Sequence, residues 1–372
     1  MTLVTGGGDV QGTNPAGVFQ GAAALWYGLE GAISGDYKRS SAALVNQASA
    51  AIGGLRGKRV VDLATGTGNT FLEEVALMPR EIICVDPSEA YLGLFKEVIL
   101  GDESIGSILE ARQVNDVLGD FSEEALVHLE NQRTAYLESA FKRRGGGVSV
   151  LRKKSQELTL DDVGGKPVHA FIGNHWIHWP FREELKAAEQ ANLPNDHERY
   201  LRALWKTLQP LARLLEPGGM VAALTGADFV RYPDRDLDRD MRERTMVGHP
   251  LFARMHMALN VLLAEGHGIT GRAVPKTTNL FDLEVFGKLV DESDCGLTLE
   301  RTDLFENTAS GAPIDGLLVR MPLWLGDVDL SIDIKLALVR EAYSTVLRTA
   351  PDEELALPLQ GYYTTLLFRK KG

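Results

Sequence analysis

The stretch from Val60 to Pro87 constrains the fold of this chain more than any other. An apolar run leads into a short turn with Gly66 and Gly68, then a helical stretch, then a second apolar run that ends on Asp86. This order predicts a strand, a glycine loop, a helix, a second strand and an acid. Asp86 lies 20 residues after Gly66, the spacing expected when a carboxylate at the tip of the second strand binds a ribose hydroxyl pair. The stretch therefore predicts a nucleoside site.

The glycine turn lacks the third glycine of the dinucleotide fingerprint. Binding of a pyrophosphate at the N-terminus of the following helix is therefore less well supported. A dinucleotide dehydrogenase and a tight turn without function stay open as alternatives. The D-L-x-x-G-x-G pattern of residues 62–68 resembles motif I of class I S-adenosylmethionine (SAM) methyltransferases, and Asp86 resembles their motif II acid. This resemblance implies SAM as the cofactor and an α/β fold with a doubly wound, seven-stranded Rossmann-like sheet.

Further apolar runs supply the remaining strands. We expect them at residues 148–151, 168–172, 220–224, 297–300 and 361–368. The L-x-P-G-G sequence of residues 215–219, before the fifth strand, is another feature of the family. The fold implies that the last strand, which follows a helix over 332–349, runs antiparallel between its neighbours.

The length of 372 residues predicts two domains, or one large domain with insertions. We expect an N-terminal helical cap over 1–54, a SAM-binding α/β core over 55–225 with a helical insertion over 101–147, a helical cap over 226–275, and the C-terminal part of the sheet over 276–372. The insertion follows strand two and contains a helical run from Ser122 to Arg144. Insertions at this edge of a sheet commonly form lids or dimer contacts, so a homodimer is left open.

The composition of the chain limits the classes of molecule that it is expected to bind. The net charge of −12 argues against nucleic acid as the main partner, because phosphate binding needs clustered cations. Two cysteines, Cys84 and Cys295, cannot form a disulfide framework. The N-terminus has no basic start or apolar core of a signal peptide, and no 18-residue apolar run occurs. We therefore expect a cytoplasmic protein that acts on a small molecule and binds no membrane.

The segment Asn174 to Trp179, at the end of the fourth predicted strand, lies where the methyl group of SAM would point. Methylation by SAM is an in-line displacement at a methyl carbon on a sulfonium, and positioning alone contributes roughly 7–11 kcal/mol to such a step. A sulfonium also favours aromatic faces and a water-poor pocket. Three of these six residues could line that pocket through aromatic or imidazole contacts.

The His-Trp pair after strand four resembles the pair at this position in trans-aconitate methyltransferases and in the SABATH family of plant carboxyl methyltransferases. Residues 69–70, 36–41 and 278–306 resemble further SABATH patterns at both ends of the chain. The resemblance implies that Tyr37 and Ser41 contact SAM and that Trp179 meets an acceptor carboxylate. The carboxylate-binding Gln of that family falls on Leu44 here, which predicts a more apolar pocket on that side.

Several roles stay open on the residues alone. His178 is a general base for a hydroxyl acceptor, or an orienting hydrogen-bond partner for a carboxylate, which is already ionised at neutral pH. Asp62 braces the glycine loop or reaches the SAM amine through water. Trp176 and Trp179 could equally be core residues, and Arg231 and Arg254 could pair with acids instead of an anionic substrate.

No carboxylate cluster accompanies His175 and His178, so we expect no metal. The candidate cofactor-binding residues are Tyr37, Ser41, Asp62, Gly66, Gly68, Asn69, Asp86, Pro87, Ser155, Gln156 and Asn174. The candidate catalytic residues are His178 and Trp179, and the candidate substrate-binding residues are Trp176, Trp179, Arg231, Tyr232 and Arg254.

The sequence thus predicts a SAM-dependent O-methyltransferase of secondary metabolism that methylates a carboxylate or hydroxyl of a small organic molecule. One alternative is an enzyme of the same fold that cyclises SAM or transfers its aminocarboxypropyl group and releases methylthioadenosine. Another is a non-catalytic SAM-binding regulator. Fold does not decide among them.

Overall fold

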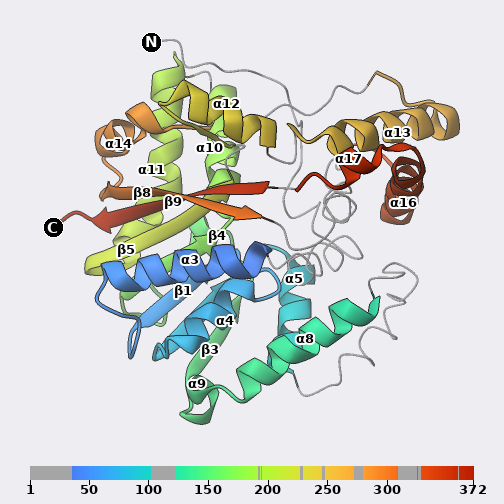
Figure 1. Ribbon diagram of the computed structural model, residues 1–372. Helices are drawn as coiled ribbons and strands as arrows, with labels where there is room; N and C mark the ends of the chain where they lie inside the picture. Colours follow the sequence, from blue (N-terminus) through green and yellow to red (C-terminus); the bar gives the residue numbers. More distant parts are fainter. Residues whose placement is uncertain are drawn as a thin grey trace.

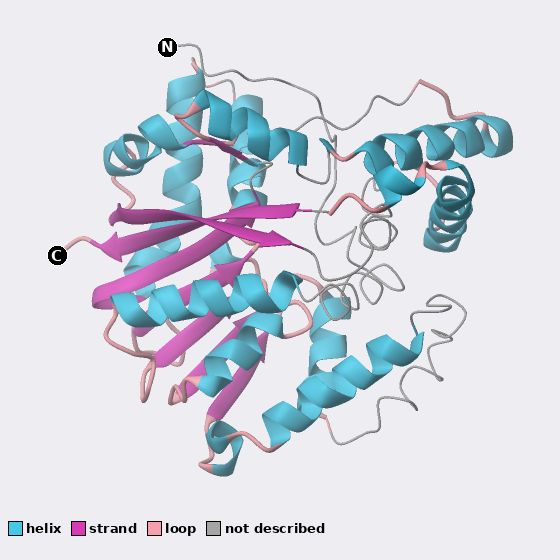
Figure 2. Cartoon of the chain, in the orientation of Figure 1, coloured by secondary structure: helices cyan, strands magenta, loops and turns pink. Residues whose placement is uncertain are grey.

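The computed structural model describes residues 36–101, 122–191, 193, 195–226, 229–244, 248–271, 280–308, 325, 328–358 and 360–372 (Figure 1). Within these residues seven strands form one sheet in the order β3-β2-β1-β4-β5-β9-β8. Figure 2 shows these strands in magenta as one twisted sheet with helices packed around it. The predicted doubly wound α/β fold is therefore confirmed.

The strands lie where the sequence predicts them. The main sheet consists of β1 (Arg59–Leu63), β2 (Glu81–Val85), β3 (Gly147–Leu151), β4 (Val168–Asn174), β5 (Leu215–Gly226), β8 (Leu297–Thr308) and β9 (Gln360–Lys370). β1 pairs in parallel with β2 and β4, whereas β9 runs antiparallel between β5 and β8, as expected. A second, parallel pair, β6 (Val230–Arg231) with β7 (Phe281–Asp282), lies within the C-terminal half.

The helices have the following bounds. On the N-terminal side they are α3 (Asp36–Ala51), α4 (Asn69–Ala76), α5 (Glu89–Leu94), the π-helix η1 (Phe95–Leu100), α8 (Ser122–Leu137), α9 (Ala140–Arg143) and the 3₁₀ turn η3 (Ser155–Glu157). On the C-terminal side they are α10 (His178–Gln190), α11 (Asp196–Leu214), α12 (Arg235–Arg244), α13 (Pro250–His267), α14 (Leu283–Glu292), α16 (Ile332–Thr349) and α17 (Asp352–Leu355).

Alternation along the strands divides the core between the two faces of the sheet. Val60, Ala170 and Met220 pack under α3, and Ile82 and Cys84 pack with the apolar stripe of α4. The opposite face is covered by α10, α11 and α14. Figure 1 shows α3 and α4 on the near side of the sheet, and α13 and α16 packed together at one end of the molecule. Because both faces are covered, β1 is buried along its whole length, as expected of a central parallel strand.

Two expected helical segments differ from the sequence prediction. The run from Ser122 to Arg144 is two helices and not one, because Ser139 has an extended backbone and its hydroxyl caps α9 by accepting from the Lys142 N–H at 3.1 Å. The helical cap expected over 226–275 also contains β6, which pairs in parallel with β7. Of the N-terminal segment, residues 1–35 lie outside the described part.

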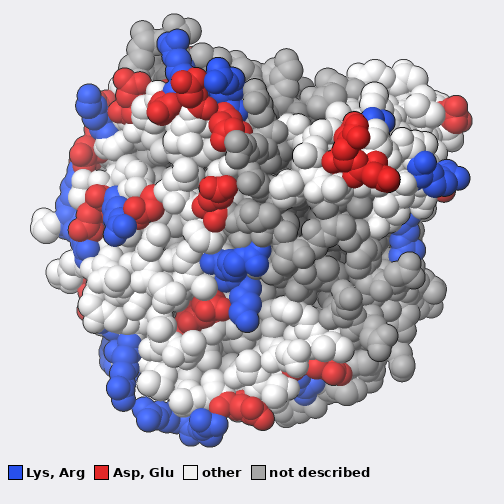
Figure 3. All heavy atoms as spheres, viewed as in Figure 1, with Lys and Arg blue, Asp and Glu red and all other residues white. Residues whose placement is uncertain are grey.

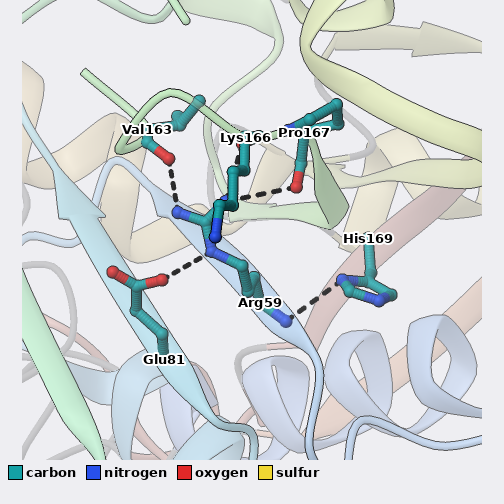
Figure 4. Close-up of polar contacts among 6 residues, drawn as sticks. All are labelled: Arg59, Glu81, Val163, Lys166, Pro167 and His169. Carbon is teal, nitrogen blue, oxygen red and sulfur yellow. Dashed lines mark hydrogen bonds and ion pairs between the residues drawn. The ribbon is translucent and has the colours of Figure 1, made fainter. Parts of the chain in front are cut away.

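Arg59 joins several segments at the amino end of the sheet (Figure 4). Its Nε donates to Glu81 Oε2 on β2 at 2.6 Å, and its Nη1 donates to the carbonyl of Lys166 at 2.6 Å. The same guanidinium reaches the carbonyls of Val163 and Pro167 in the segment before β4. The Arg59 side chain is 5% exposed, so its charge is stabilised by these acceptors and not by water.

Replacement of Arg59 by Met should lower the free energy of unfolding by about 3 kcal/mol, because it leaves buried carbonyls without a donor and Glu81 without its cation. Arg152→Met is the matched control: Arg152 pairs with Glu89 at the same 2.6 Å, but these side chains are 59% and 77% exposed, so the loss should stay below about 1 kcal/mol. Urea unfolding of both variants measures the difference. Equal losses would contradict this role of Arg59.

Candidate functional site

The carboxyl ends of β1, β2, β4 and β5 meet at one edge of the sheet. Chain order reverses between β1 and β4 there, and in open α/β sheets ligands bind at such a switch point. Loops that leave these strands carry Gly66, Asp86 and Asn174. The residues that the sequence singled out around strands one, two and four are therefore brought to the same edge.

The glycine loop after β1 uses left-handed backbone at three positions. Gly66 has a φ of 55° and Gly68, the N-cap of α4, a φ of 94°. Ala64 has a φ of 53° although it carries a Cβ, a conformation that costs an L-residue about 1–2 kcal/mol. A Cβ on Gly68 would lie 2.8 Å from two ring carbons of Phe95. Gly68 is therefore needed both for its φ and for the close approach of η1.

Asp86 ties the two loops together. Its Oδ2 accepts from the Gly66 N–H at 3.0 Å and its Oδ1 from the Ser88 N–H at 2.8 Å. The side chain is buried, and burial raises the pKa of Asp86 to about 6, although both N–H donors pull it down. Pro87, directly after it, is half-buried. Carboxylate oxygens accept more than one hydrogen bond each, so Asp86 keeps acceptor capacity for two ligand hydroxyls.

Asp62 and Asn174 carry buried acceptors without a donor. Asp62, fully buried at the end of β1, has neither carboxyl oxygen hydrogen-bonded among the described residues, and Asn174 Oδ1 is likewise unpartnered. The amide Nδ2 of Asn174 donates to Ser41 Oγ at 2.8 Å and to Ser40 Oγ at 3.2 Å. Ser41 in turn lies 3.2 Å from Thr70 Oγ1. Buried unpartnered acceptors are costly, and a ligand with N–H or O–H donors would satisfy them.

The predicted contacts from the N-terminal segment are partly placed. Ser41 is joined to Asn174, as described above. Tyr37 lies in α3, but its side chain is outside the described part. Leu44 is fully buried between α3 and the sheet, in a cluster with Val60 and Ile172, so it is a core residue, and the more apolar pocket predicted on its side stays a prediction.

The insertion after strand two reaches the glycine loop. Gln132 on α8 donates through Nε2 to Asn69 Oδ1 at 2.8 Å, and α8 packs against α4 and η1. Asn69 is therefore held by the insertion as well as by its own helix. The sequence alone could not predict this contact, because it joins positions far apart in the chain.

Ser155 and Gln156, after β3, form a second wall. The Trp176 indole Nε1 donates to Ser155 Oγ at 2.9 Å, and Ser155 Oγ donates to Gln156 Oε1 at 3.2 Å. Trp176 is only 4% exposed and packs in the core under α10 and α11. Trp176 therefore fixes Ser155 from inside the core, and its predicted contact with substrate stays a prediction.

His178 lies in an aromatic and hydroxyl-rich cluster at the end of β4. Its ring stacks on Phe229 with centroids 4.1 Å apart, and its Nδ1 lies 3.1 Å from Thr225 Oγ1. Trp179, half-buried, has its ring 5.1 Å from that of His178. Burial, followed by the charges of His175 and Arg182, lowers the pKa of His178 well below its ordinary value. His178 is therefore neutral at pH 7.

Other aromatic and hydroxyl side chains close this cluster. The ring of His175, which has a left-handed φ of 52°, lies 5.1 Å from that of Tyr363. The Tyr232 hydroxyl bonds to Thr364 Oγ1 on β9, and Thr364 is the cross-strand partner of Thr225. Tyr232 is thus linked to His178 through Thr364 and Thr225, and its predicted contact with substrate stays a prediction. Sequence reasoning missed Thr225, Phe229 and Tyr363; their only signal was their position at the ends of β5 and β9.

The two predicted arginine clamps lie elsewhere. Arg254 on α13 forms a bidentate ion pair with Glu354 on α17. Arg231 is 3.7 Å from Asp282 and lines an open pocket of about 490 Å³ that Arg235 and Glu284 also line. No contact within the described part joins either arginine to His178, so their role in substrate binding stays a prediction.

Surface charge, possible metal ligands and possible membrane-spanning helices were compared over the described residues. Figure 3 shows Lys and Arg interspersed with Asp and Glu on the face in view. In the part of the chain that is described, no three His, Cys, Asp or Glu side chains gather as a metal site. No helix there combines the length and apolar character needed to span a bilayer.

No protein-family model matches the sequence, and no curated protein matches it significantly. Among solved structures, loganic acid methyltransferase with S-adenosylhomocysteine is similar at a TM-score of 0.50 and 13% identity, over 97% of this chain and 98% of that one. A SAM-dependent methyltransferase from Thiobacillus denitrificans, also with S-adenosylhomocysteine, gives 0.37 and 13%, over 88% and 91%. A cyclopropane synthase from Mycobacterium tuberculosis gives 0.38 and 12%, over 88% and 83%.

The likeness to loganic acid methyltransferase extends over nearly the whole of both chains. The strand order agrees with it, including the antiparallel β9 between β5 and β8. The chain therefore has the Rossmann-like fold of class I SAM-dependent methyltransferases, as the sequence predicts. At this identity the likeness concerns the fold and leaves the substrate undetermined.

Replacement of Gly68 by Ala should lower the free energy of unfolding by about 2 kcal/mol, from the positive φ together with the clash with Phe95. Gly93→Ala is the control, because Gly93 lies inside α5 and a Cβ there meets nothing within 4 Å; it should be neutral or stabilising. Thermal and urea unfolding distinguish the two variants. A Gly68→Ala protein as stable as Gly93→Ala would show that the loop tolerates a side chain.

Proposed function

We propose that this protein is a SAM-dependent methyltransferase that transfers a methyl group to a carboxylate or hydroxyl of a small organic molecule. The observation that carries the proposal is the arrangement at the switch point of the sheet. Asp86 is hydrogen-bonded to the glycine loop, and the unpartnered acceptors of Asp62 and Asn174 lie at the ends of the adjacent strands. The class I methyltransferase fold supports the same cofactor.

SAM, when bound, supplies a methyl group on a positively charged sulfur. In this chain Asp86 would accept the ribose hydroxyls, and Gly66 and Gly68 keep the loop free of side chains where the nucleoside approaches. Asp62 and Asn174 would receive donors from the methionyl end, directly or through water. Ser155 and Gln156 are candidates for the adenine side. The unpartnered acceptors of Asp62 and Asn174 fit a ligand that is positively charged and rich in hydrogen-bond donors.

The cluster around His178 suits the acceptor side. Its rings offer aromatic faces to a flat or apolar acceptor and to the positively charged methyl donor. A low pKa makes His178 a weak base, so orientation of the acceptor by a hydrogen bond suits it better than removal of a proton. A carboxylate acceptor, already ionised at neutral pH, needs orientation only. This reasoning favours a small organic acid over a phenol.

Product analysis tests the reaction. The protein is incubated with SAM and a panel of small organic acids and phenols, and chromatography with mass detection follows S-adenosylhomocysteine, methylthioadenosine and the methylated acceptor. Accumulation of S-adenosylhomocysteine with an equal amount of methyl ester or methyl ether supports the proposal. Release of methylthioadenosine would instead show cyclisation or aminocarboxypropyl transfer. Binding of SAM without turnover of any acceptor would favour a regulator.

Asp86→Asn should weaken SAM binding by about 1.5–3 kcal/mol, or roughly 10- to 150-fold, because a charge-assisted contact with the ribose is lost. In the unaltered protein the contribution of Asp86 should make the affinity fall by up to about tenfold per pH unit below pH 6, since protonation of Asp86 removes the acceptor. Asp86→Asn should lose this dependence.

Calorimetric titration at several pH values measures these effects, with NAD as a ligand that should not bind. Asp161→Asn, an exposed Asp on the loop before β4, is the control for loss of a carboxylate and should bind SAM normally. Unchanged SAM affinity in Asp86→Asn would remove Asp86 from the cofactor site.

Trp179→Ala should lower turnover by about 100-fold while SAM affinity stays within about threefold, because the ring meets the acceptor and a misplaced acceptor loses the in-line geometry. Trp205→Ala, the same change at a half-buried position on α11, should leave turnover per folded molecule unchanged. Steady-state kinetics and calorimetry supply the two readouts. Loss of SAM binding with a normal rate per bound cofactor would make Trp179 a wall of the cofactor site instead.

A further inference from the structure

Glu74 is a charged residue in a position where a helix of this sheet would ordinarily bury an apolar side chain. It lies on the buried stripe of α4 with Thr70, Phe71 and Val75, and it is fully buried. Neither of its carboxyl oxygens has a hydrogen-bond partner in the part of the chain that is described. No sequence motif predicts a role for this residue, and the function proposed above does not use it.

Glu74 and Asp62 face the same interior region. Thr70, one turn before Glu74 on α4, lies 3.2 Å from Ser41, which is held by Asn174 at the end of β4. Asp62 and Asn174 point to the same face of the sheet, because each follows residues of its strand that pack under α3, at an even spacing. Asn174, 7% exposed, adds its unpartnered Oδ1 to this region.

Charge in this region is unbalanced. Burial, and then the charge of Asp62, raise the pKa of Glu74 well above its ordinary value. Burial likewise raises the pKa of Asp62; the Thr65 hydroxyl lowers this pKa and the charge of Asp86 raises it, each by less than burial does. No Lys, Arg or His of the described residues forms an ion pair with either carboxyl. Two like charges in one buried region cannot both persist without a cation.

The surrounding elements carry few groups that could change this balance. They are Lys38 and Arg39 on α3, Glu73 on α4, Cys84 on β2, Asp86 directly after β2, His128 on α8 and His175 after β4. Burial raises the pKa of Glu73 and lowers that of His128, and the charge of Lys38 lowers the pKa of both. Burial, and then the charges of Asp62 and Glu74, raise the pKa of the Cys84 thiol, which therefore stays neutral. Asp86 adds negative charge and so strengthens the need for a proton or a cation.

We propose that Asp62 and Glu74 hold one proton between them in the free protein and release it to solvent when the cationic methionyl end of SAM binds at the end of β1. The pair then changes its charge from −1 to −2 as the ligand brings positive charge, so charge and protons balance. Glu74 is a positioning residue, which acts on the ligand through Asp62. This inference rests on the function proposed above, because it takes SAM as the ligand.

Calorimetric titration with SAM at pH 7.5, in phosphate and in Tris, counts the protons released, since the two buffers differ in ionisation enthalpy. We expect about one proton per SAM bound and an association constant that rises up to tenfold per pH unit between pH 7 and 8. Asp86, with a pKa of about 6, is already mostly ionised in that range. Methylthioadenosine, which keeps the ribose but lacks the cationic end, should bind without proton release.

Glu74→Gln keeps the shape of the side chain and removes one of the two buried carboxyl groups. This variant should release less than half of the wild-type proton count and show a correspondingly flatter pH dependence. Glu73→Gln, the same change at the neighbouring position facing Lys38, should behave as wild type. Asp62→Asn provides a second variant of the pair with the same expected loss if Glu74→Gln does not fold.

The outcomes separate the two proposals. Failure of SAM to bind the wild-type protein would overturn the proposed function. Binding of SAM without proton release, equal release with methylthioadenosine, or full release in Glu74→Gln would overturn the shared proton alone.

Discussion

Parallel pairing of β1 with both β2 and β4 is the constraint on which the rest of the structure depends. The register aligns Asp62 with Cys84 on one side and with Ile172 on the other, so all three strands end at one edge. The loops that follow them must therefore share a small volume. At the opposite end of β1, Arg59 binds β2 and the segment before β4 with one guanidinium, which holds the same three segments together where they begin.

Two residues with strained backbone lie at the edge where the strands end. Ala64 and His175, the residues that leave β1 and β4, both have left-handed φ values, 53° and 52°. Such conformations persist only where the surroundings over-determine them. Near Ala64, the Asp86 carboxylate accepts a hydrogen bond from the N–H of Gly66. Near His175, the ring of Tyr363 lies with its centroid 5.1 Å from that of His175. Both turns direct side chains and N–H groups into the region where the cofactor and acceptor are proposed to bind.

The two halves of this edge differ in their chemistry. The half between β1 and β2 collects carboxyl groups whose pKa values burial raises, among them Asp62, Glu74 and Asp86. The half beyond β4 collects rings and hydroxyls around His178, whose pKa burial lowers. An acidic, donor-poor half suits a cationic ligand, whereas a neutral aromatic half suits an organic acceptor. This division is the physical basis for placing cofactor and acceptor on opposite sides of β4.

The sequence by itself determined the strands, their order along the chain and the glycine loop, because apolar runs and the spacing from Gly66 to Asp86 are local signals. It also predicted that Asp86 lies at the edge formed by the carboxyl ends of the strands, since parallel strands end together. Only the tertiary structure decided that Trp176 belongs to the core and supports Ser155, that Arg254 is paired with Glu354, and that Phe229 stacks on His178. Each of these depends on which distant segment packs nearby, which no local pattern records. Glu74 shows the limit most clearly: a Glu next to another Glu on a helix reads as solvated surface, and only the packing of α4 onto the sheet buries it beside Asp62.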